Sequence, residues 1–533
     1  MAEHKEDSLL ANWQCMIAVI IVSMSPFQYG IDYGLIGGIQ AMIGFLQIYG
    51  YEDPSLPLGW NLTATRQQLI SSLMVLGAVI ASGCAGPIAW KLGRKTCLWA
   101  ACALLSVGNI IMMATTHIGA LYAGRFILGL GNGLLMTFSQ LYIQEVTPAR
   151  YRGLALASFQ FFTSIGTLIG TIVDNFTAKR EGRSAYLIPL GLIYVVPVVI
   201  CVGLIFIPES PRWLLEHDQP DKARKALAWL RPHLERVEEE LSAIQAGIDQ
   251  EKSLKASVSV WDMFTDPVDR RRTILSVAAI NTQAASGAMF IIAYGTYFFE
   301  MAGVGNSFQN SCILTSVGVI AIILNTCIIT RFGRRRLFLI TGLLLCGFMQ
   351  LIIAVVYTTK PGSPAASKVI VALSILYMFS YNGLIATYAW LSGGEIPSQR
   401  LRSYTFGLAA SIGFIGAWLA TFTAPYFINP SALNWGPRYG YIWFPSCMVA
   451  AVFIYFFLPE IKDRTLEEIS EMFEAGLPAR KFKGYKCVGA AAVVAAEKKE
   501  KGDEIEVSTQ EVVWRDPKAA SESAAVVGSR RSQ

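Results

Sequence analysis

The stretch YAGRFILGLGNGLLMTFSQLYIQEVTPARYRG, residues 122–153, decides the fold class of this chain. Its residues 126–144 include no ionisable side chain, which is about the length needed to cross a bilayer core. Arg125 begins this run, where a charge beside lipid is unfavourable by several kcal/mol unless it is paired or hydrated. Three glycines allow a second helix to pack closely: Gly129, Gly131 and Gly133. The pattern predicts a transporter that spans a membrane several times.

The composition supports a membrane protein and excludes several other classes. Charged residues make up 15% of the chain and hydrophobic residues 53%, whereas soluble domains have about 25% charged residues. The net charge of +6 comes from basic residues at the ends of apolar runs, so nucleic-acid binding is not expected. Ten cysteines without regular spacing and four scattered histidines predict neither a disulfide framework nor a metal site. No cofactor is expected.

Twelve apolar runs of spanning length fall into two groups of six. The first group lies near 15–36, 68–90, 97–116, 119–144, 154–177 and 186–207. The second lies near 273–299, 308–330, 337–358, 367–394, 403–428 and 437–458. Most basic loop residues fall in alternate short loops, which places both termini and the central loop in the cytoplasm. The first outward loop then contains Asn61-Leu62-Thr63, a sequon that predicts a glycan on Asn61.

The predicted fold class is an all-α membrane protein of twelve transmembrane helices in two six-helix halves. We expect a cytoplasmic tail (1–14), an N-terminal half (15–207), a cytoplasmic helical linker (208–272), a C-terminal half (273–458) and a cytoplasmic tail (459–533), disordered beyond about residue 487. The linker is predicted to be helical because apolar residues recur at helical spacing, at Leu234, Val237, Leu241, Ile244 and Ile248. A flexible linker is the alternative.

Short motifs recur about 240–250 residues apart, so the two halves look like copies of each other. Gly93-Arg94-Lys95 after the second span is echoed by Gly333-Arg334-Arg335 after the eighth. A glutamate, a proline and an arginine follow both the fourth and the tenth spans. Pro-Glu follows both the sixth and the twelfth, at 208–209 and 459–460.

These motifs resemble the sugar porter family of the major facilitator superfamily, over roughly residues 15–485. The residues that establish the resemblance are YGIDYG (29–34), GPIAWKLGRK (86–95), GRFILGLGNG (124–133), EVTPARYRG (145–153), PESPRWL (208–214), RFGRR (331–335) and PEIKDRTLEEI (459–469). GTYFFEMAG (295–303) and PARKFKGY (478–485) are similar to the fungal branch, including its alpha-glucoside permeases. The resemblance implies the major facilitator fold and a plasma-membrane location.

Asp32 and Arg125 are the candidate proton-coupling pair. Asp32 is an acid inside the first span, and Arg125 is its most plausible counter-charge. If transport changes their separation, Asp32 gains or loses a proton in step with it. The resemblance implies the same role for Asp32, while a static ion pair that only fixes helix packing is the alternative.

A second group of charges resembles the cytoplasmic gate of the family. It comprises Arg94, Glu145, Arg152 and Glu209 in one half and Arg334, Glu395, Arg402 and Glu460 in the other. Ordinary positive-inside topology would explain the arginines but not the repeated glutamates. The acid that the family pattern places before each loop glycine is replaced by Trp90 and Thr330, so part of the network is expected to be weaker.

The resemblance places four residues at solute-facing positions: Gln160, Gln283, Asn382 and Trp390. Amides both donate and accept hydrogen bonds, and an indole offers a flat apolar face, so both suit a sugar. Other positions that usually have amides in hexose carriers are apolar or small here, at Ala284, Met289, Gly318 and Gly413. The pocket is therefore expected to be larger and less polar than a glucose site.

The expected function is secondary active transport, as proton-coupled symport of a hexose or alpha-glucoside-like sugar by alternating access. The partners would be this solute, protons and the lipid bilayer, and the functional unit a monomer. A carrier or exporter of a less polar secondary metabolite is one alternative, and a non-transporting sugar sensor is another. An enzyme is not expected, because Gly129-Leu130-Gly131-Asn132-Gly133 lies within an apolar helix without a preceding strand.

Overall fold

The computed structural model describes residues 12–485 except 55, 57, 181, 232–236, 258, 333, 399, 463 and 465. The chain divides into two compact units, Met1–Leu458 and Pro459–Gln533. Most of the predicted N-terminal tail and all residues beyond 485, including the segment predicted to be disordered, lie outside the described residues.

The N-terminal half of the first unit consists of six spans. They are α2 (Trp13–Ile39), α4 (Ala64–Leu92), α5 (Arg94–Ala114), α6 (Ile118–Val146), α7 (Ala149–Thr177) and a broken sixth span made of α8 (Ser184–Leu192) and α9 (Val195–Phe206). A short hairpin segment connects the first two spans and contains α3 (Ile43–Tyr49), β1 (Tyr51–Glu52) and β2 (Trp60–Asn61). The two strands pair antiparallel, with Tyr51 opposite Asn61.

The C-terminal half repeats this plan with more interruptions. Its spans are α14 (Pro267–Ala285) with α15 (Ala288–Met301), α16 (Ser307–Phe332), α17 (Arg335–Thr359), α18 (Pro364–Ser380) with α19 (Thr387–Glu395), α20 (Arg402–Ile428) and α21 (Gly440–Phe457). A π-helical segment, η2 (Tyr381–Ala386), joins α18 to α19, and a 3₁₀ turn, η3 (Gly436–Tyr439), precedes α21.

The predicted fold class is confirmed. Eleven stretches of described residues are long and apolar enough to cross a membrane, and α7 occupies the position of the remaining predicted span. Large apolar side chains are exposed on the outside of these helices, for example Ile205 at 63% and Val449 at 71%. Such exposure suits contact with lipid rather than water.

The linker is helical rather than irregular. It contains α10 (Pro211–Glu216), α11 (Pro220–Leu230), α12 (Val237–Ser257) and α13 (Asp262–Thr265). The apolar stripe predicted from the sequence forms a small core, in which Ile248 is 3% exposed and Leu241 and Ile244 pack against Leu214 and Ala223. Leu234 of that stripe lies outside the described residues.

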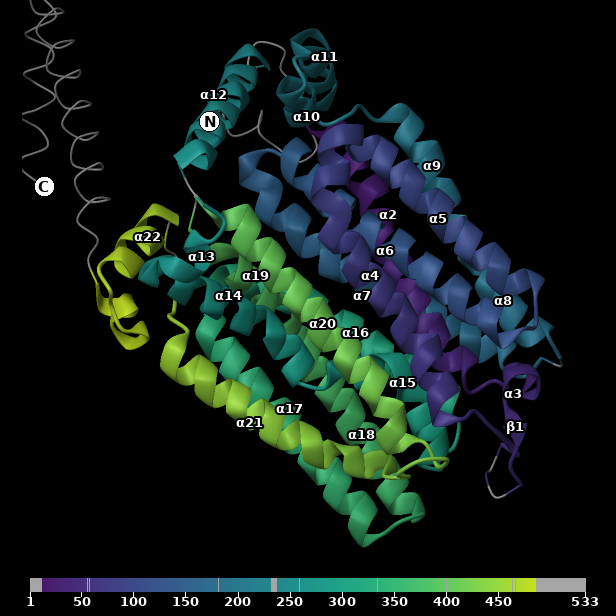
Figure 1. Ribbon diagram of the computed structural model, residues 1–533. Helices are drawn as coiled ribbons and strands as arrows, with labels where there is room; N and C mark the ends of the chain where they lie inside the picture. Colours follow the sequence, from purple (N-terminus) through teal and green to yellow (C-terminus); the bar gives the residue numbers. More distant parts are fainter. Residues whose placement is uncertain are drawn as a thin grey trace, which may run out of the picture. The chain divides into compact units, whose positions relative to one another are not determined.

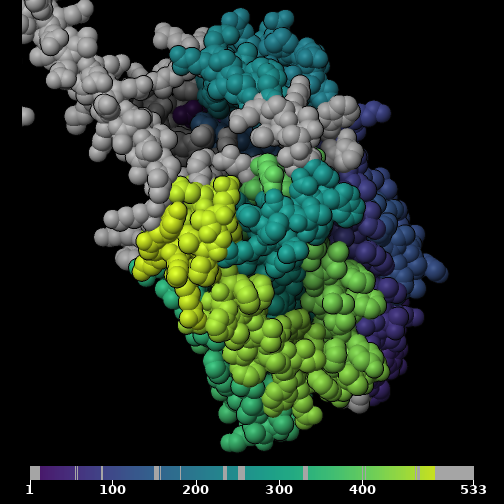
Figure 2. All heavy atoms as spheres, turned by 60° about the vertical axis from the view of Figure 1, so that its left-hand side comes forward, coloured from purple at the N-terminus to yellow at the C-terminus, as the bar shows by residue number. Residues whose placement is uncertain are grey.

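The two halves lie side by side, as the purple-to-blue and teal-to-green helices show in Figures 1 and 2. They meet along α2 and α15, α4 and α20, and α7 and α16. Below, the linker end of the bundle is the end where α6 finishes and the linker packs, because Arg231 donates to the Val146 carbonyl at 3.0 Å. The opposite end, which contains β1 and β2, is the hairpin end.

The alternating glycines of α6 explain how its polar face can lie at the centre of the N-terminal half. A Cβ at Gly133 would lie 2.6 Å from the Ala78 carbonyl oxygen of α4, and one at Gly131 would lie 2.9 Å from the Ala101 carbonyl oxygen of α5. Larger residues at these positions would push the neighbouring helices away. The close approach predicted from the sequence is present.

The second unit is a short helical segment. It contains α22 (Leu466–Glu474) and the 3₁₀ turn η4 (Ala479–Gly484). Arg464 pairs with Glu468 at 3.3 Å and donates to the Tyr485 carbonyl at 2.8 Å, while the rings of Phe473 and Phe482 lie 5.1 Å apart.

Candidate functional site

Asp32 lies inside α2 and is only 1% exposed. Its carboxylate accepts a hydrogen bond from the Asn132 amide of α6 and a second from Gln28, one turn earlier on α2, at 3.2 Å. Two neutral amides therefore solvate the acid in place of water. A buried carboxylate without such donors would be strongly unfavourable.

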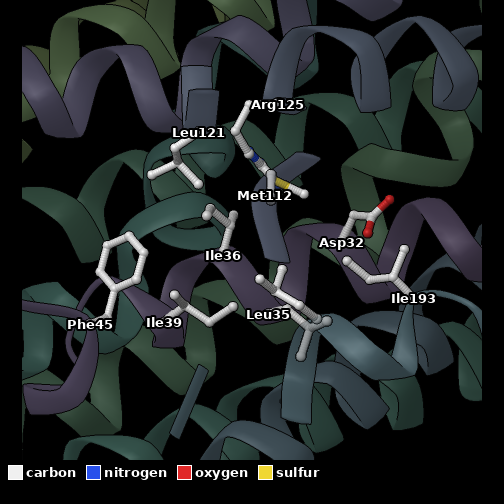
Figure 3. Close-up of a pocket in the computed structure, with 10 residues that line it drawn as sticks. Asp32, Leu35, Ile36, Ile39, Phe45, Met112, Leu121, Arg125 and Ile193 are labelled. Carbon is white, nitrogen blue, oxygen red and sulfur yellow. The ribbon is translucent and has the colours of Figure 1, made fainter. Parts of the chain in front are cut away.

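Arg125 reaches the same region from α6. Its Nε donates to the Ile70 carbonyl at 2.9 Å, and Nη2 lies 3.2 Å from the Met74 sulfur, both on α4. Asp32 and Arg125 line one cavity of about 10 Å³, enough for a single water (Figure 3). Among the described residues they form no direct ion pair. The carboxylate instead accepts hydrogen bonds from amides, and the guanidinium donates to α4.

Two helix interruptions in the C-terminal half lie beside the predicted solute-facing residues. Span seven breaks at Gly287, whose φ of 81° favours glycine, and a Cβ there would lie 2.6 Å from the Trp443 ring. Span ten changes to π-helical geometry at η2, a distortion that occurs frequently at functional sites. Backbone groups released at such breaks are free to bind side chains or a solute.

Gln283 and Asn382 come together at the second interruption. The Gln283 amide donates to the Ala386 carbonyl at 2.9 Å, the last residue of η2, and Asn382 lies in the same segment. A Cβ on Gly318 of α16 would lie 2.5 Å from the Asn382 amide nitrogen. The missing side chain at Gly318 therefore makes room for Asn382.

The other two predicted residues have different surroundings. Gln160 of α7 is half-buried, and no group among the described residues hydrogen-bonds its amide. Trp390 of α19 is half-buried and packs against α20, with its ring 6.0 Å from Phe406 and 6.5 Å from Phe414. Gln160 thus has an unengaged amide, whereas Trp390 is held in an aromatic cluster.

At the linker end of the N-terminal half, Arg94 and Glu209 each have several partners. Arg94 pairs with Glu145 at 2.7 Å and with Glu216 of the linker at 3.9 Å. Glu209 accepts backbone N–H bonds from Lys95 at 3.1 Å and Ser210 at 2.9 Å. These charges fasten α5, α6 and the linker to one another. The side chain of Arg152 lies outside the described residues.

In the C-terminal half, the partner of Glu395 is Arg335, at 2.9 and 3.1 Å, rather than the expected Arg334, which is exposed. Arg335 is the first residue of α17, as Arg94 is the first residue of α5. The counterpart of Arg94 in the second half is therefore Arg335, by its place at the helix start, and not Arg334, by its place in the motif. Arg402 is half-buried. Glu460 belongs to the second unit, where it accepts from the Lys462 amide at 3.2 Å.

At the hairpin end, neutral polar groups connect the two halves. Asn429, at the end of α20, donates to the Leu62 carbonyl and to Gln67, both at 2.9 Å. Tyr297 of α15 donates to Asn61 at 2.9 Å, and the Ala64 amide donates to Ser431 at 3.0 Å. We call Asn61, Gln67, Tyr297, Asn429 and Ser431 the hairpin-end latch.

The latch includes Asn61, the residue at which the sequon predicts a glycan. This side chain is 1% exposed, and its amide is engaged with Tyr51, Asn429 and Tyr297. In this conformation the Asn61 side chain supplies a contact between the two halves, which leaves no room for an oligosaccharide on its amide nitrogen. The glycan at Asn61 stays a prediction.

Comparison with known proteins identifies the family. The family model described as "Sugar (and other) transporter" matches residues 18–473. The chain belongs to the sugar transporter family. Sugar transporters are not enzymes, in agreement with the expectation from the sequence.

Individual relatives include transporters and a sensor. The chain is 29% identical to the major facilitator-type transporter ecdD of Aspergillus rugulosus, over 97% of this chain and 96% of that one. It is 29% identical to the low-affinity glucose transporter HXT3 of Saccharomyces cerevisiae, over 86% and 82%. The high glucose sensor RGT2 of S. cerevisiae is 30% identical over 87% of this chain, which spans only 61% of the sensor's length.

Solved structures of the Escherichia coli xylose transporter XylE share the fold. Its partially occluded inward-open form aligns with a TM-score of 0.70 at 16% identity, covering 85% of this chain and 99% of that one. Its inward-open form gives 0.69 at 19% identity, covering 85% and 99%. These alignments confirm the major facilitator fold predicted from the sequence.

Several site residues were missed by the sequence analysis of this sugar transporter. They are Gln28, Asn132, Arg335 and the latch residues Gln67, Tyr297, Asn429 and Ser431. Gln28 lies four residues before Asp32, so helical spacing could have identified it. The latch residues lie up to about 370 residues apart and carry no local signal.

We predict that Asn429→Ala opens the hairpin end. The change removes the donors to Gln67 and to the Leu62 carbonyl, at a cost of about 1–3 kcal/mol, so the ratio of closed to open conformation should fall roughly 5- to 150-fold. The measurement is labelling of a cysteine introduced at the buried Ala64 by a membrane-impermeant maleimide applied to that side. Thr359→Ala, exposed at the end of α17, is the control. Unchanged labelling of the Asn429 variant would contradict the latch.

We also predict a pH dependence of stability from Glu209. Burial raises the pKa of its carboxyl above the ordinary value of about 4.3, opposed by N–H bonds from Ser210 and Lys95 and by the charge of Arg94. The folded state therefore binds this proton more tightly than the unfolded state, and stability falls as pH rises through the raised pKa.

The measurement compares the thermal midpoints of the wild type and Glu209→Gln in detergent from about pH 4 upward. The stability of the wild type relative to the variant should decline with rising pH. Glu52→Gln, an exposed change in β1, should show no such trend. A relative stability that increases with pH would refute the assignment.

Proposed function

We propose that this chain is a proton-coupled symporter of a sugar that works by alternating access. The observation on which the proposal depends is Asp32, an acid buried within a transmembrane helix that lines, together with Arg125, a cavity the size of one water. Intramembrane acids are costly and are usually functional. The sugar comes from the hexose or alpha-glucoside-like class.

The surroundings of Asp32 support proton exchange better than a static ion pair. Its direct partners are the neutral amides of Asn132 and Gln28. Protonation of Asp32 therefore does not break an ion pair. Arg125 keeps its own contacts with α4 and acts on Asp32 through the cavity. Asn132 and Asp32 lie on different helices, so movement of α6 against α2 would alter the solvation of the acid.

The polar contacts of the two ends support alternating access. At the hairpin end, the latch joins the halves. At the linker end, the ion pairs of Arg94 and Arg335 lie within one half or reach the linker. This arrangement corresponds to a conformation closed at the hairpin end. Breaking the latch would lead to the conformation that is open at the hairpin end.

The solute would bind between the amides of Gln160 and Gln283, with Asn382 and the face of Trp390 completing the site. Gln160 belongs to the N-terminal half and the other three residues to the C-terminal half. Movement of one half relative to the other would therefore change the contacts of a bound solute. The linker end, rich in arginine, is proposed to face the cytoplasm together with both termini. We place the protein in the plasma membrane as a functional monomer, with Arg152 and Arg402 completing the cytoplasmic gate.

A sugar sensor is the second candidate, favoured by the similarity to the high glucose sensor RGT2. It differs from the symporter in having no flux. A carrier or exporter of a less polar metabolite remains the alternative within transport, because Gly318 and Gly413 leave two positions without polar side chains. In the structure Gly318 lies next to the Asn382 side chain, and Gly413 lies next to the Ile280 side chain.

We predict that Asp32→Asn abolishes uphill accumulation while leaving solute exchange. The amide cannot release a proton, so a pH gradient no longer drives transport. The measurement is uptake of labelled hexoses and glucosides by proteoliposomes with an imposed pH gradient, together with counterflow. Asp221→Asn, an exposed change in α11, is the matched control. Uphill accumulation by the Asp32 variant would remove proton coupling, and absence of flux in the wild type would favour the sensor.

We predict that Gln283→Ala raises KM for the transported sugar roughly 5- to 150-fold, as expected for loss of hydrogen bonding worth about 1–3 kcal/mol. The measurement is concentration-dependent uptake across a panel from disaccharides to apolar metabolites. Gln245→Ala, a half-buried position on the linker helix α12, is the control. An unchanged KM for every sugar, with a raised KM for an apolar solute, would favour the alternative carrier.

A further inference from the structure

A second buried acid, Asp174, lies near the hairpin end of α7. It is 1% exposed and is located three residues before the helix ends at Thr177. Neither carboxylate oxygen has a side-chain hydrogen-bond partner among the described residues, and no basic side chain there forms an ion pair with it. Asp174 therefore differs from Asp32, which two amides solvate.

The carboxyl group of Asp174 packs directly against α2. A Cβ at Gly38 would collide with this carboxyl group, so the glycine provides the space that it occupies. The contact with Gly38 is made through backbone atoms, which provide no opposite charge. An ionised carboxylate in this position would lose most of its hydration without compensation, at a cost of several kcal/mol. The neutral acid is the form that suits the site.

The site adjoins the contact between the two halves. Thr171, one turn before Asp174, shares a hydrogen bond of 3.0 Å with Thr315 of α16, and the Cys312 thiol donates to the Thr171 carbonyl at 3.3 Å. These bonds connect α7 of one half to α16 of the other. Separation of the halves at the hairpin end would therefore expose the surroundings of Asp174 to water.

A cavity with a mixed apolar and polar lining provides an approach from the hairpin end. It has a volume of about 110 Å³, enough for several waters, and Asn175, Ala178 and Lys179 contribute to its lining. Ala178 follows Asp174 by four residues and so lies on the same face of the chain. Water can thus reach within one helical turn of the carboxyl group.

We infer that Asp174 is a second proton-binding site, occupied when the hairpin end is closed and released when it opens. The inference rests on the alternating-access part of the proposed function and is independent of coupling through Asp32. Closure would take up a proton at Asp174, so by linkage a low pH on that side favours the closed conformation.

Other titratable groups near this site have separate environments. They are Asp32 and Tyr33 on α2, Tyr294 on α15, Cys312 on α16 and Lys179 beyond the end of α7. Asp32 precedes Gly38 by six residues, about 9 Å along the helix, and is solvated by its own amides. Lys179 is exposed and remains hydrated. Asp174 is therefore the group whose hydration changes most when the two halves separate.

The test measures the separation of the two halves at the hairpin end as a function of pH. Nitroxide labels are attached at Thr116→Cys and Lys360→Cys, two exposed positions at this end of opposite halves, with Cys84, Cys327 and Cys487 replaced by serine. Pulsed electron paramagnetic resonance in nanodiscs then gives the populations of short and long distances. In the wild type, the long-distance population should grow as pH rises.

Asp174→Asn should lose this pH response and keep the short distance throughout, because the amide imitates the neutral acid. Asp174→Glu should retain a pH response, which shows that the position tolerates substitution. The comparison is made in the Asp32→Asn background, so that the proton proposed to bind at Asp32 does not contribute to the pH response. In infrared difference spectra, the carbonyl band of a protonated carboxyl group should disappear in Asp174→Asn.

In the Asp32→Asn background, a pH response that persists after Asp174→Asn would overturn the inference, as would distances that do not depend on pH before that change. Neither result would bear on proton coupling through Asp32, which the accumulation assay tests separately. Conversely, uphill accumulation by Asp32→Asn would remove that coupling and leave the pH response of Asp174 unaffected.

Discussion

The structure depends on how an apolar bundle accommodates a few polar groups that water cannot reach. Asp32 is the clearest case, because its carboxylate is solvated by the amides of Asn132 and Gln28 and not by the nearby guanidinium. Asn132 reaches Asp32 from α6, where the neighbouring Gly131 and Gly133 let that helix pack closely against α5 and α4. Helix packing and the chemistry of the acid are thus parts of the same arrangement.

Much of the fold could be predicted from the sequence, because membrane spans are coded locally. An apolar run of about twenty residues bounded by charges has few alternatives to a spanning helix. The structure places all twelve predicted spans within a few residues of their expected ends, except that α14 begins at Pro267, where Asp266 caps the helix. The breaks at Gly287 and η2 were not predicted, because contacts with Trp443 and with the side chain of Gln283 define them.

The candidate site was less predictable, for reasons that differ between residues. Asp32 could be found because an acid in an apolar run is conspicuous. Arg335 was missed because the motif spacing pointed to Arg334, whereas the start of α17 determines which arginine reaches Glu395. The burial of Asn61 could not be predicted from its sequon, because that burial depends on Asn429 and Tyr297 from the other half. Pairings across the bundle cannot be read from local spacing.

The two ends of the bundle use different chemistry, and this difference fits movement of two rigid halves. Within each half, and between a half and the linker, charged pairs such as Arg94 with Glu145 provide the polar contacts. Between the halves, the latch uses neutral amides and hydroxyls. Hydrogen bonds to charged groups contribute about 1.5–3 kcal/mol, and neutral ones about 1 kcal/mol. The contacts between the halves are therefore the weaker ones, so the halves can separate while each remains intact.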